Sequence, residues 1–229
     1  MKGLLITLVV LVGLAVVADR VGVGIAEKQV AEQIRSHGNL SGAPSVDITG
    51  FPFLTQAIAG DYEDVRISLS AADLGQPAGT SADVSLRGVH VPLSDVLSGS
   101  VQRIPVDSVA GRATVSYALL SEKLGGDTTL RREGSGLRIT KTVHIAGFTL
   151  PLTAAGTVRL SGNDLLIDVQ KASGVGASVP GFLVDQVSGL LDLRYPIPAL
   201  PFGLKVTGVQ PGADGVEVAV AATNTVLSG

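Results

Sequence analysis

The side chains that most often carry chemistry are few in this chain and lie far apart in the sequence. His37, His90 and His144 are its only histidines, and cysteine is absent. A hydrolase needs a nucleophile, a base and a group that orients the base within reach of one another, and no Gly-x-Ser-x-Gly elbow is present. We therefore interpret all three histidines as surface residues, with His37 at a helix end that favours a positive charge.

Metal and nucleotide sites are not expected either. No His-x-x-x-His spacing occurs, and the lack of cysteine removes every thiolate ligand. Asp61, Glu63 and Asp64 offer oxygens to a calcium ion but lack the Asp-x-Asp-x-Asp-Gly register, so a solvated turn is the preferred interpretation. Gly22-Val23-Gly24 begins like a dinucleotide fingerprint, but Glu27 stands where the third glycine belongs. We expect no cofactor, no metal and no catalytic residue, and hence no enzyme.

The composition favours an apolar partner over a nucleic acid. Hydrophobic residues make up 45% of the chain and aromatic residues 3%, so aliphatic side chains supply most of the apolar surface. The formal net charge is −3 and the pI is about 5.6. Lysine and arginine are therefore not in excess, as binding to a phosphate backbone requires.

The N-terminus carries an export segment. Lys2 precedes an uncharged apolar run from Gly3 to Ala18, and Asp19-Arg20 ends it. A short positive region, an apolar stretch and small residues at its end are typical of a secretory signal peptide. The run is slightly shorter than the ~20 residues that a transmembrane helix needs. We expect residues 1–18 to be a signal peptide or an inner-membrane anchor, and residues 19–229 to be a single exported domain in the periplasm or cell envelope.

The remainder is expected to be α+β, with few helices and many strands. Apolar residues recur at helical spacing from Asp19 to about His37, and from Ser45 onward they alternate with polar residues, as in antiparallel strands with one dry face. Short helices are predicted at Leu54–Ile58, Ser94–Leu97, Ser116–Leu124 and Pro180–Leu191. Hairpin loops are predicted at Arg132–Gly136, Ser161–Asp164 and Pro211–Gly215. A long curved sheet wrapped around one or two helices fits this pattern.

One corner of this sheet stands out. The string Gly50-Phe51-Pro52-Phe53-Leu54-Thr55-Gln56 places two of the five phenylalanines beside a glycine and a proline, and Gly60 can close a short helix after it. Two interpretations stay open: the corner plugs one end of the core, or it forms the mouth of an apolar pocket.

The same string carries a resemblance to a known family. Together with Gly60-x-Tyr62-x-x-Val65, Val91-Pro92-Leu93-Ser94-Asp95-Val96 and Leu200-Pro201-Phe202-Gly203-Leu204, it resembles the actinobacterial envelope family of the lipomannan elongation-associated phospholipid-binding protein. The resemblance covers roughly Asp19 to Leu227. It implies a periplasmic or membrane-associated protein with a tubular, lipid-binding-protein-like fold, and it transfers no catalytic residues.

The resulting hypothesis is an exported binder that shelters phospholipid acyl chains and assists lipomannan or other envelope lipid assembly. Its expected partners are phospholipid, the membrane surface and envelope biosynthesis proteins, and not nucleic acid. The alternative is a membrane-tethered scaffold that docks onto another envelope protein and has no lipid cavity. The lipid-binding residues are predicted from the bulky apolar side chains at corners and on the helix near residue 180: Phe51, Phe53, Leu54, Ile58, Phe148, Phe182, Leu183, Leu190, Leu200 and Phe202.

Overall fold

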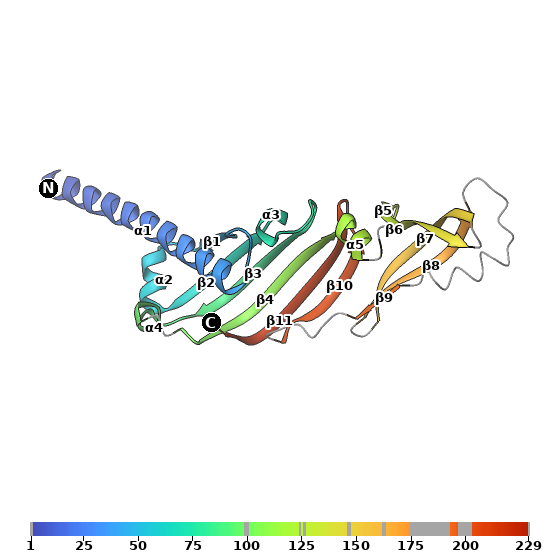
Figure 1. Ribbon diagram of the computed structural model, residues 1–229. Coiled ribbons are helices and arrows are strands. Elements are labelled where there is room, and N and C mark those ends of the chain that lie inside the picture. The colour runs from blue at the N-terminus through green and yellow to red at the C-terminus, as the bar shows by residue number, and fades with distance from the viewer. Residues whose placement is uncertain are drawn as a thin grey trace. The chain divides into compact units, whose positions relative to one another are not determined.

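The computed structural model describes residues 2–98, 101–123, 125, 127–145, 148–161, 164–174, 193–196 and 203–228. The chain forms an α+β structure within these residues, as predicted (Figure 1). Its helices are α1 (Lys2–His37), α2 (Phe53–Ala59), α3 (Ala71–Leu74), α4 (Leu93–Ser98) and α5 (Tyr117–Lys123). Its strands are β1 (Ser45–Thr49), β2 (Asp61–Leu69), β3 (Ser81–His90), β4 (Arg103–Ser116), β5 (Thr128–Glu133), β6 (Gly136–Ile145), β7 (Phe148–Ser161), β8 (Asp164–Gly174), β9 (Leu193–Pro196), β10 (Lys205–Pro211) and β11 (Gly215–Ser228).

The described strands form two sheets. Hydrogen bonds connect six strands in the order β1-β2-β3-β4-β11-β10 and five in the order β5-β6-β7-β8-β9. The pairs β1/β2, β10/β11 and β5 through β9 are antiparallel. The expected long antiparallel sheet is thereby confirmed. The hairpin at Arg132–Gly136 is confirmed by the pairing of Glu133 with Gly136, and the C-terminal hairpin by that of Pro211 with Val216.

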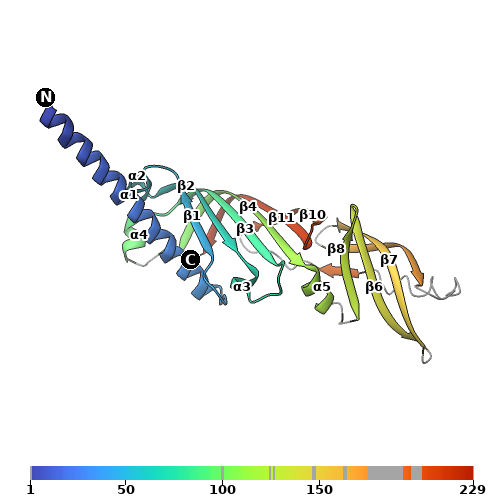
Figure 2. The same cartoon turned by 90° about the horizontal axis from the view of Figure 1, so that it is seen from above.

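The chain forms two compact units, of which the first comprises Met1–Leu69, Asp83–Gly111 and Ala222–Gly229. Val46 and Ile48 alternate with exposed neighbours along β1, as the period-2 pattern predicted. Helix α1 lies beside β1, and Glu27 Oε1 accepts a hydrogen bond from the Ile48 N–H at 3.0 Å (Figure 2). Because β1 ends the six-stranded order, this side chain satisfies a backbone donor that the sheet leaves unpaired.

The second unit comprises Ser70–Ala82 and Arg112–Ala221. Its buried cluster consists of Leu130, Leu137, Ile139 and Val216, against which Tyr117 and Leu120 of α5 pack. The predicted start of α5 is confirmed, because the buried Ser116 Oγ accepts a hydrogen bond from the Leu119 N–H at 3.2 Å.

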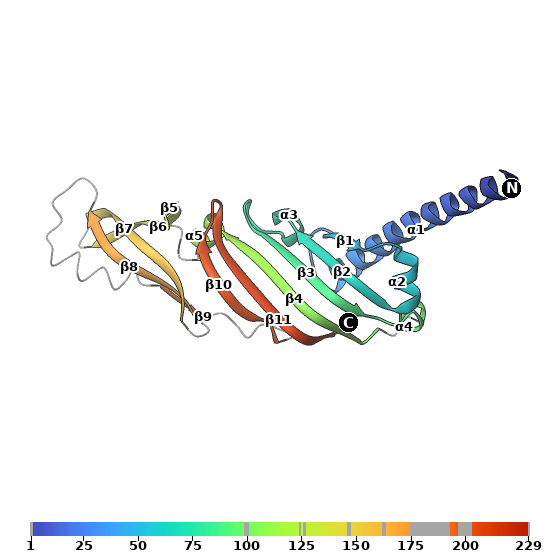
Figure 3. The ribbon, with the colours of Figure 1, turned by 180° about the vertical axis from the view of Figure 1, so that it is seen from behind.

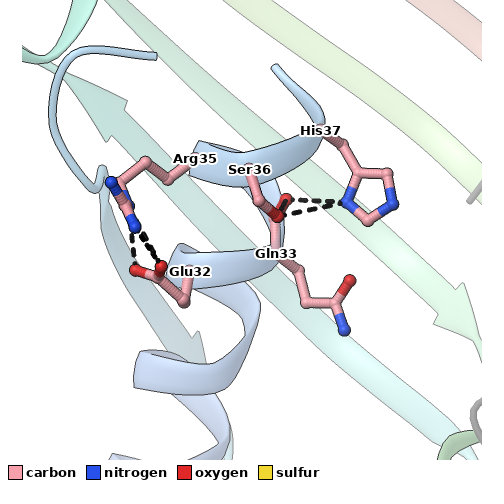
Figure 4. A network of polar contacts seen from close by, with 5 residues as sticks. All are labelled: Glu32, Gln33, Arg35, Ser36 and His37. Carbon is pink, nitrogen blue, oxygen red and sulfur yellow. Dashed lines mark hydrogen bonds and ion pairs between the residues drawn. The ribbon is translucent and has the colours of Figure 1, made fainter. Parts of the chain in front are cut away.

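The N-terminal helix differs from the expected one. The sequence predicts an apolar segment up to Ala18 and a separate helix from Asp19, whereas α1 runs unbroken from Lys2 to His37. Leucine and valine side chains of the apolar run are exposed along its length. The helix ends at the predicted residue, where His37 Nδ1 lies 3.0 Å from the Gln33 carbonyl oxygen and Arg35 pairs with Glu32 (Figure 4).

Some local features were not predicted. Helix α3 was missed, although Ser70 and Asp73 form a complete capping box at its start. Strand β3 runs unbroken through Gly88, whose φ is +60°. The predicted helix Pro180–Leu191 lies outside the described residues.

Candidate functional site

The one histidine with described partners in the sheet is paired with two carboxylates. His90 Nδ1 lies 2.6 Å from Asp61 Oδ1, and its Nε2 lies 3.3 Å from Asp107 Oδ1. These bonds, that to Asp61 first and that to Asp107 second, raise the pKa of His90 above its ordinary value. The imidazole is half-exposed, so His90 is a surface residue, as the sequence predicted, and its pairing with two carboxylates was not predicted. The side chain of His144 lies outside the described ones.

Asp61, Glu63 and Asp64 were predicted to form a solvated turn, and the predicted turn is wrong. Asp61, Glu63 and Asp64 lie within strand β2. Asp64 accepts hydrogen bonds from Ser85 Oγ at 2.7 Å and Arg66 Nε at 2.8 Å. Partial burial opposes ionisation of Asp64, but these partners outweigh it and lower its pKa. The described residues contain no cluster of three or more His, Cys, Asp or Glu side chains suited to a metal ion.

The corner at Gly50–Gly60 is held together by a buried amide. Gln56 Nε2 donates to the Thr49 carbonyl at 3.3 Å, and Gln56 Oε1 accepts from the Glu63 N–H at 2.9 Å. Gly50 has φ +106°, and a Cβ at this position would overlap the Gln56 side chain. Gln56 therefore links the end of β1 to the start of β2, and it requires glycine at residue 50.

The inner side of α2 packs against α1. Phe53 is 5% exposed, and its ring centroid lies 6.2 Å from that of Tyr62. A Cβ added at Gly22 would meet Leu54 and Phe53 at 3.5 to 3.7 Å, so the two helices approach closely at this residue. The predicted helical turn closed by Gly60 is confirmed, because Gly60 has φ +75° and its N–H donates to the Gln56 carbonyl.

A carboxylate on α1 caps α2. Pro52, the N-cap residue of α2, makes no side-chain hydrogen bond to the helix. Asp19 Oδ1 instead accepts from the Leu54 N–H at 2.8 Å, and its other oxygen pairs with Arg20 at 2.6 Å. Asp19 is 1% exposed, so the helix that packs over it hides its charge from the surroundings. Sequence reasoning missed this role, and its one signal was an acidic residue directly after the apolar run.

The outer side of α2, together with Phe51 just before the helix, is apolar and exposed. Phe51 is 65% exposed, Leu54 40% and Ile58 75%. The guanidinium carbon of Arg20 lies 5.3 Å from the Phe51 ring centroid, within the range of a cation–π contact. We call Phe51, Leu54 and Ile58 the α2 surface. Figure 3 shows α2 and α4 at the end of the first unit from which the N-terminal half of α1 projects.

The predicted lipid-binding residues thus divide into four groups. Phe53 is buried in the corner, whereas the three residues of the α2 surface are exposed. Phe148 begins β7 and pairs with Ile145, and its side chain is not among the described ones. The remaining five lie outside the described residues: Phe182, Leu183, Leu190, Leu200 and Phe202.

A comparison with models of known protein families gives a match for this chain. The model of the LmeA-like phospholipid-binding family matches residues 17–221. The chain belongs to this family. The match begins two residues before Asp19 and takes in both the corner and the sheets. No curated protein and no solved structure matches the chain significantly.

Proposed function

We propose that this member of the LmeA-like family is an exported protein that shelters phospholipid acyl chains in an apolar tube and assists the assembly of lipomannan or other envelope lipids. The family match is the observation that carries the proposal, because it spans most of the chain and concerns phospholipid binding. Helix α1 adds support, since it is long and apolar enough to cross a membrane. Each methylene withdrawn from water contributes roughly 0.8 kcal/mol, so two acyl chains supply ample free energy for binding.

The proposed lining keeps all ten predicted residues, and the exposed apolar α2 surface supports it at one end. A mouth for acyl chains needs large apolar side chains that are open to an incoming lipid, and Phe51 and Ile58 have this exposure. Phe53 plays the supporting part, because its buried ring fixes the position of α2.

Lipid content of the purified full-length chain tests the proposal. The protein is purified from a membrane fraction in mild detergent, and native mass spectrometry and lipid extraction measure the bound phospholipid. We expect phospholipid in a fixed ratio to protein in independent preparations. Protein that is repeatedly free of phospholipid would contradict the proposal and favour the scaffold alternative.

Two matched alanine variants separate the mouth from the architecture. Phe51→Ala removes an exposed ring, so we expect reduced phospholipid retention with a nearly unchanged unfolding midpoint. Phe53→Ala removes a buried ring, which typically costs about 3 to 5 kcal/mol of unfolding free energy. A Phe51→Ala variant that loses stability as Phe53→Ala does, and retains its lipid, would make Phe51 a structural residue.

A further inference from the structure

The apolar run of α1 is shorter than the hydrocarbon core of a membrane is thick. Residues 3 to 18 number sixteen, and at about 1.5 Å per residue they span ~24 Å of helix. The hydrocarbon core of a bilayer is about 30 Å thick, so the run is ~6 Å short. Four more residues of α1 make up this difference, and these are Asp19 to Gly22.

Helix α2 packs at this level of α1. Its first residues touch Gly22, and its backbone N–H at Leu54 binds Asp19. The contact buries the Asp19 carboxylate, the charge that a bilayer would least tolerate next to the apolar run. The exposed apolar side chains near this contact are Val21 on α1, Phe51 just before α2, and Leu54 and Ile58 on α2.

Arg20 completes the pattern of an interfacial anchor. Its side chain is half-exposed, and its guanidinium lies over the Phe51 ring. An arginine at the end of an apolar helix places its charged head at lipid phosphates while its stem stays among apolar groups. The exposed Phe51 ring beside it adds apolar surface for contact with the upper acyl layer.

We propose that the α2 surface, with Val21 and Arg20, lies in the headgroup and upper acyl layer of the bilayer that α1 spans. Helix α2 then extends the apolar belt of an otherwise short membrane helix. The corner that the sheet presents at this end is held against the membrane surface. This proposal depends on α1 remaining attached as an anchor, and not on whether the protein also carries phospholipid inside.

Single tryptophans test the proposal, because the natural chain contains none. Full-length Phe51→Trp and Ile58→Trp variants are reconstituted in vesicles of phosphatidylcholine and phosphatidylglycerol, with and without phosphatidylcholine brominated near the headgroup end of its acyl chains. His37→Trp is the matched control, since His37 is exposed at the end of α1, away from the part of α1 that contacts α2. It lies fifteen residues after Gly22, about 22 Å farther along α1.

We expect the emission of Phe51→Trp and Ile58→Trp to shift to shorter wavelength in vesicles and to be quenched by the brominated lipid. The emission of His37→Trp should do neither. Quenching at residues 51 and 58 that does not exceed quenching at residue 37 would overturn the proposal. Shielding of these two tryptophans only after an envelope protein extract is added would also overturn it, and would assign the surface to a protein partner.

Phospholipid extraction from the same variants, purified in detergent before they are reconstituted, keeps this proposal separate from the proposed function. Quenched tryptophans on a chain that retains no phospholipid after detergent purification would support the membrane contact and contradict the acyl-chain tube. Retained phospholipid with unquenched tryptophans would do the reverse.

Discussion

Gly50 shows how a single residue fixes the α2 corner. Its φ of +106° is unfavourable for any residue with a side chain, and a Cβ there would overlap the Gln56 amide. We expect Gly50→Ala to lower the free energy of unfolding by about 1 to 3 kcal/mol. Urea unfolding in mild detergent, followed by circular dichroism, measures the effect.

Gly24 supplies the matched control for this substitution. A Cβ at Gly24 would have open space, and its backbone is helical. Gly24→Ala should leave stability unchanged or raise it by up to about 1 kcal/mol, because alanine is the better helix former. Equal unfolding midpoints for Gly50→Ala and Gly24→Ala would show that the corner tolerates a side chain at residue 50.

His90 gives the surface of the first unit a pH dependence. Its folded-state pKa is raised above the ordinary value of 6.5, chiefly by Asp61 and next by Asp107. The stabilisation from this pairing is therefore fully present below pH 6.5 and is lost as the pH rises through the raised pKa. An NMR titration of the imidazole should show the raised pKa, with a larger decrease in Asp61→Asn than in Asp107→Asn. A titration that neither variant alters would contradict the pairing.

At the scale of elements, α2 depends on α1 for its first turn. Asp19 supplies the cap that Pro52 lacks, so the Leu54 N–H loses its partner in Asp19→Ala. We expect hydrogen exchange at the Leu54 amide to accelerate roughly five- to tenfold in this variant. Asp19→Asn keeps a side-chain acceptor and should accelerate exchange less. Exchange at Leu54 that is the same in all three proteins would mean that water or another group caps the helix.

Local patterns in the sequence predict the elements better than they predict the contacts between them. Alternation identified β1, and turn residues identified the hairpins that join β5 to β6 and β10 to β11. The sequence does not show that β3 continues through Gly88, where the alternation is interrupted without a break in the backbone. It also divided α1 at Asp19, because a charge after an apolar run resembles a boundary whether or not the helix continues.

The position of the candidate site could be predicted from the sequence, but the burial and the contacts of its side chains could not. The Gly50–Gln56 string indicated a tight apolar corner, and Gly60 indicated its end. Which ring is buried depends on the packing of α2 against Gly22, more than twenty residues away in sequence. The same is true of Asp19 and Gln56, whose roles follow from partners that no local pattern contains.

At the scale of the whole molecule, the proposed membrane contact requires that α1 crosses the membrane, and both proposals require that the sheets lie outside the cytoplasm. The chain has no cysteine, so single cysteines report each location without a background. Ser135 is exposed in the turn between β5 and β6, and Leu8 lies in the apolar run. A membrane-impermeant maleimide should label Ser135→Cys in intact spheroplasts, because an exported domain meets the reagent directly.

Two further cysteines complete this topology experiment. Leu8→Cys should stay unlabelled until detergent dissolves the bilayer around it, and Gly3→Cys, which keeps the charge of Lys2 and has open space for a side chain, until the membrane is made permeable. Because the charge of Lys2 favours the cytoplasmic side, the pattern follows from the positive-inside tendency as well as from export. Labelling of Ser135→Cys only after permeabilisation would place the sheets in the cytoplasm and remove the basis of an envelope role. Loss of Leu8→Cys from the purified protein would show that the segment is cleaved, and α2 would then meet the membrane without the helix that sets its depth.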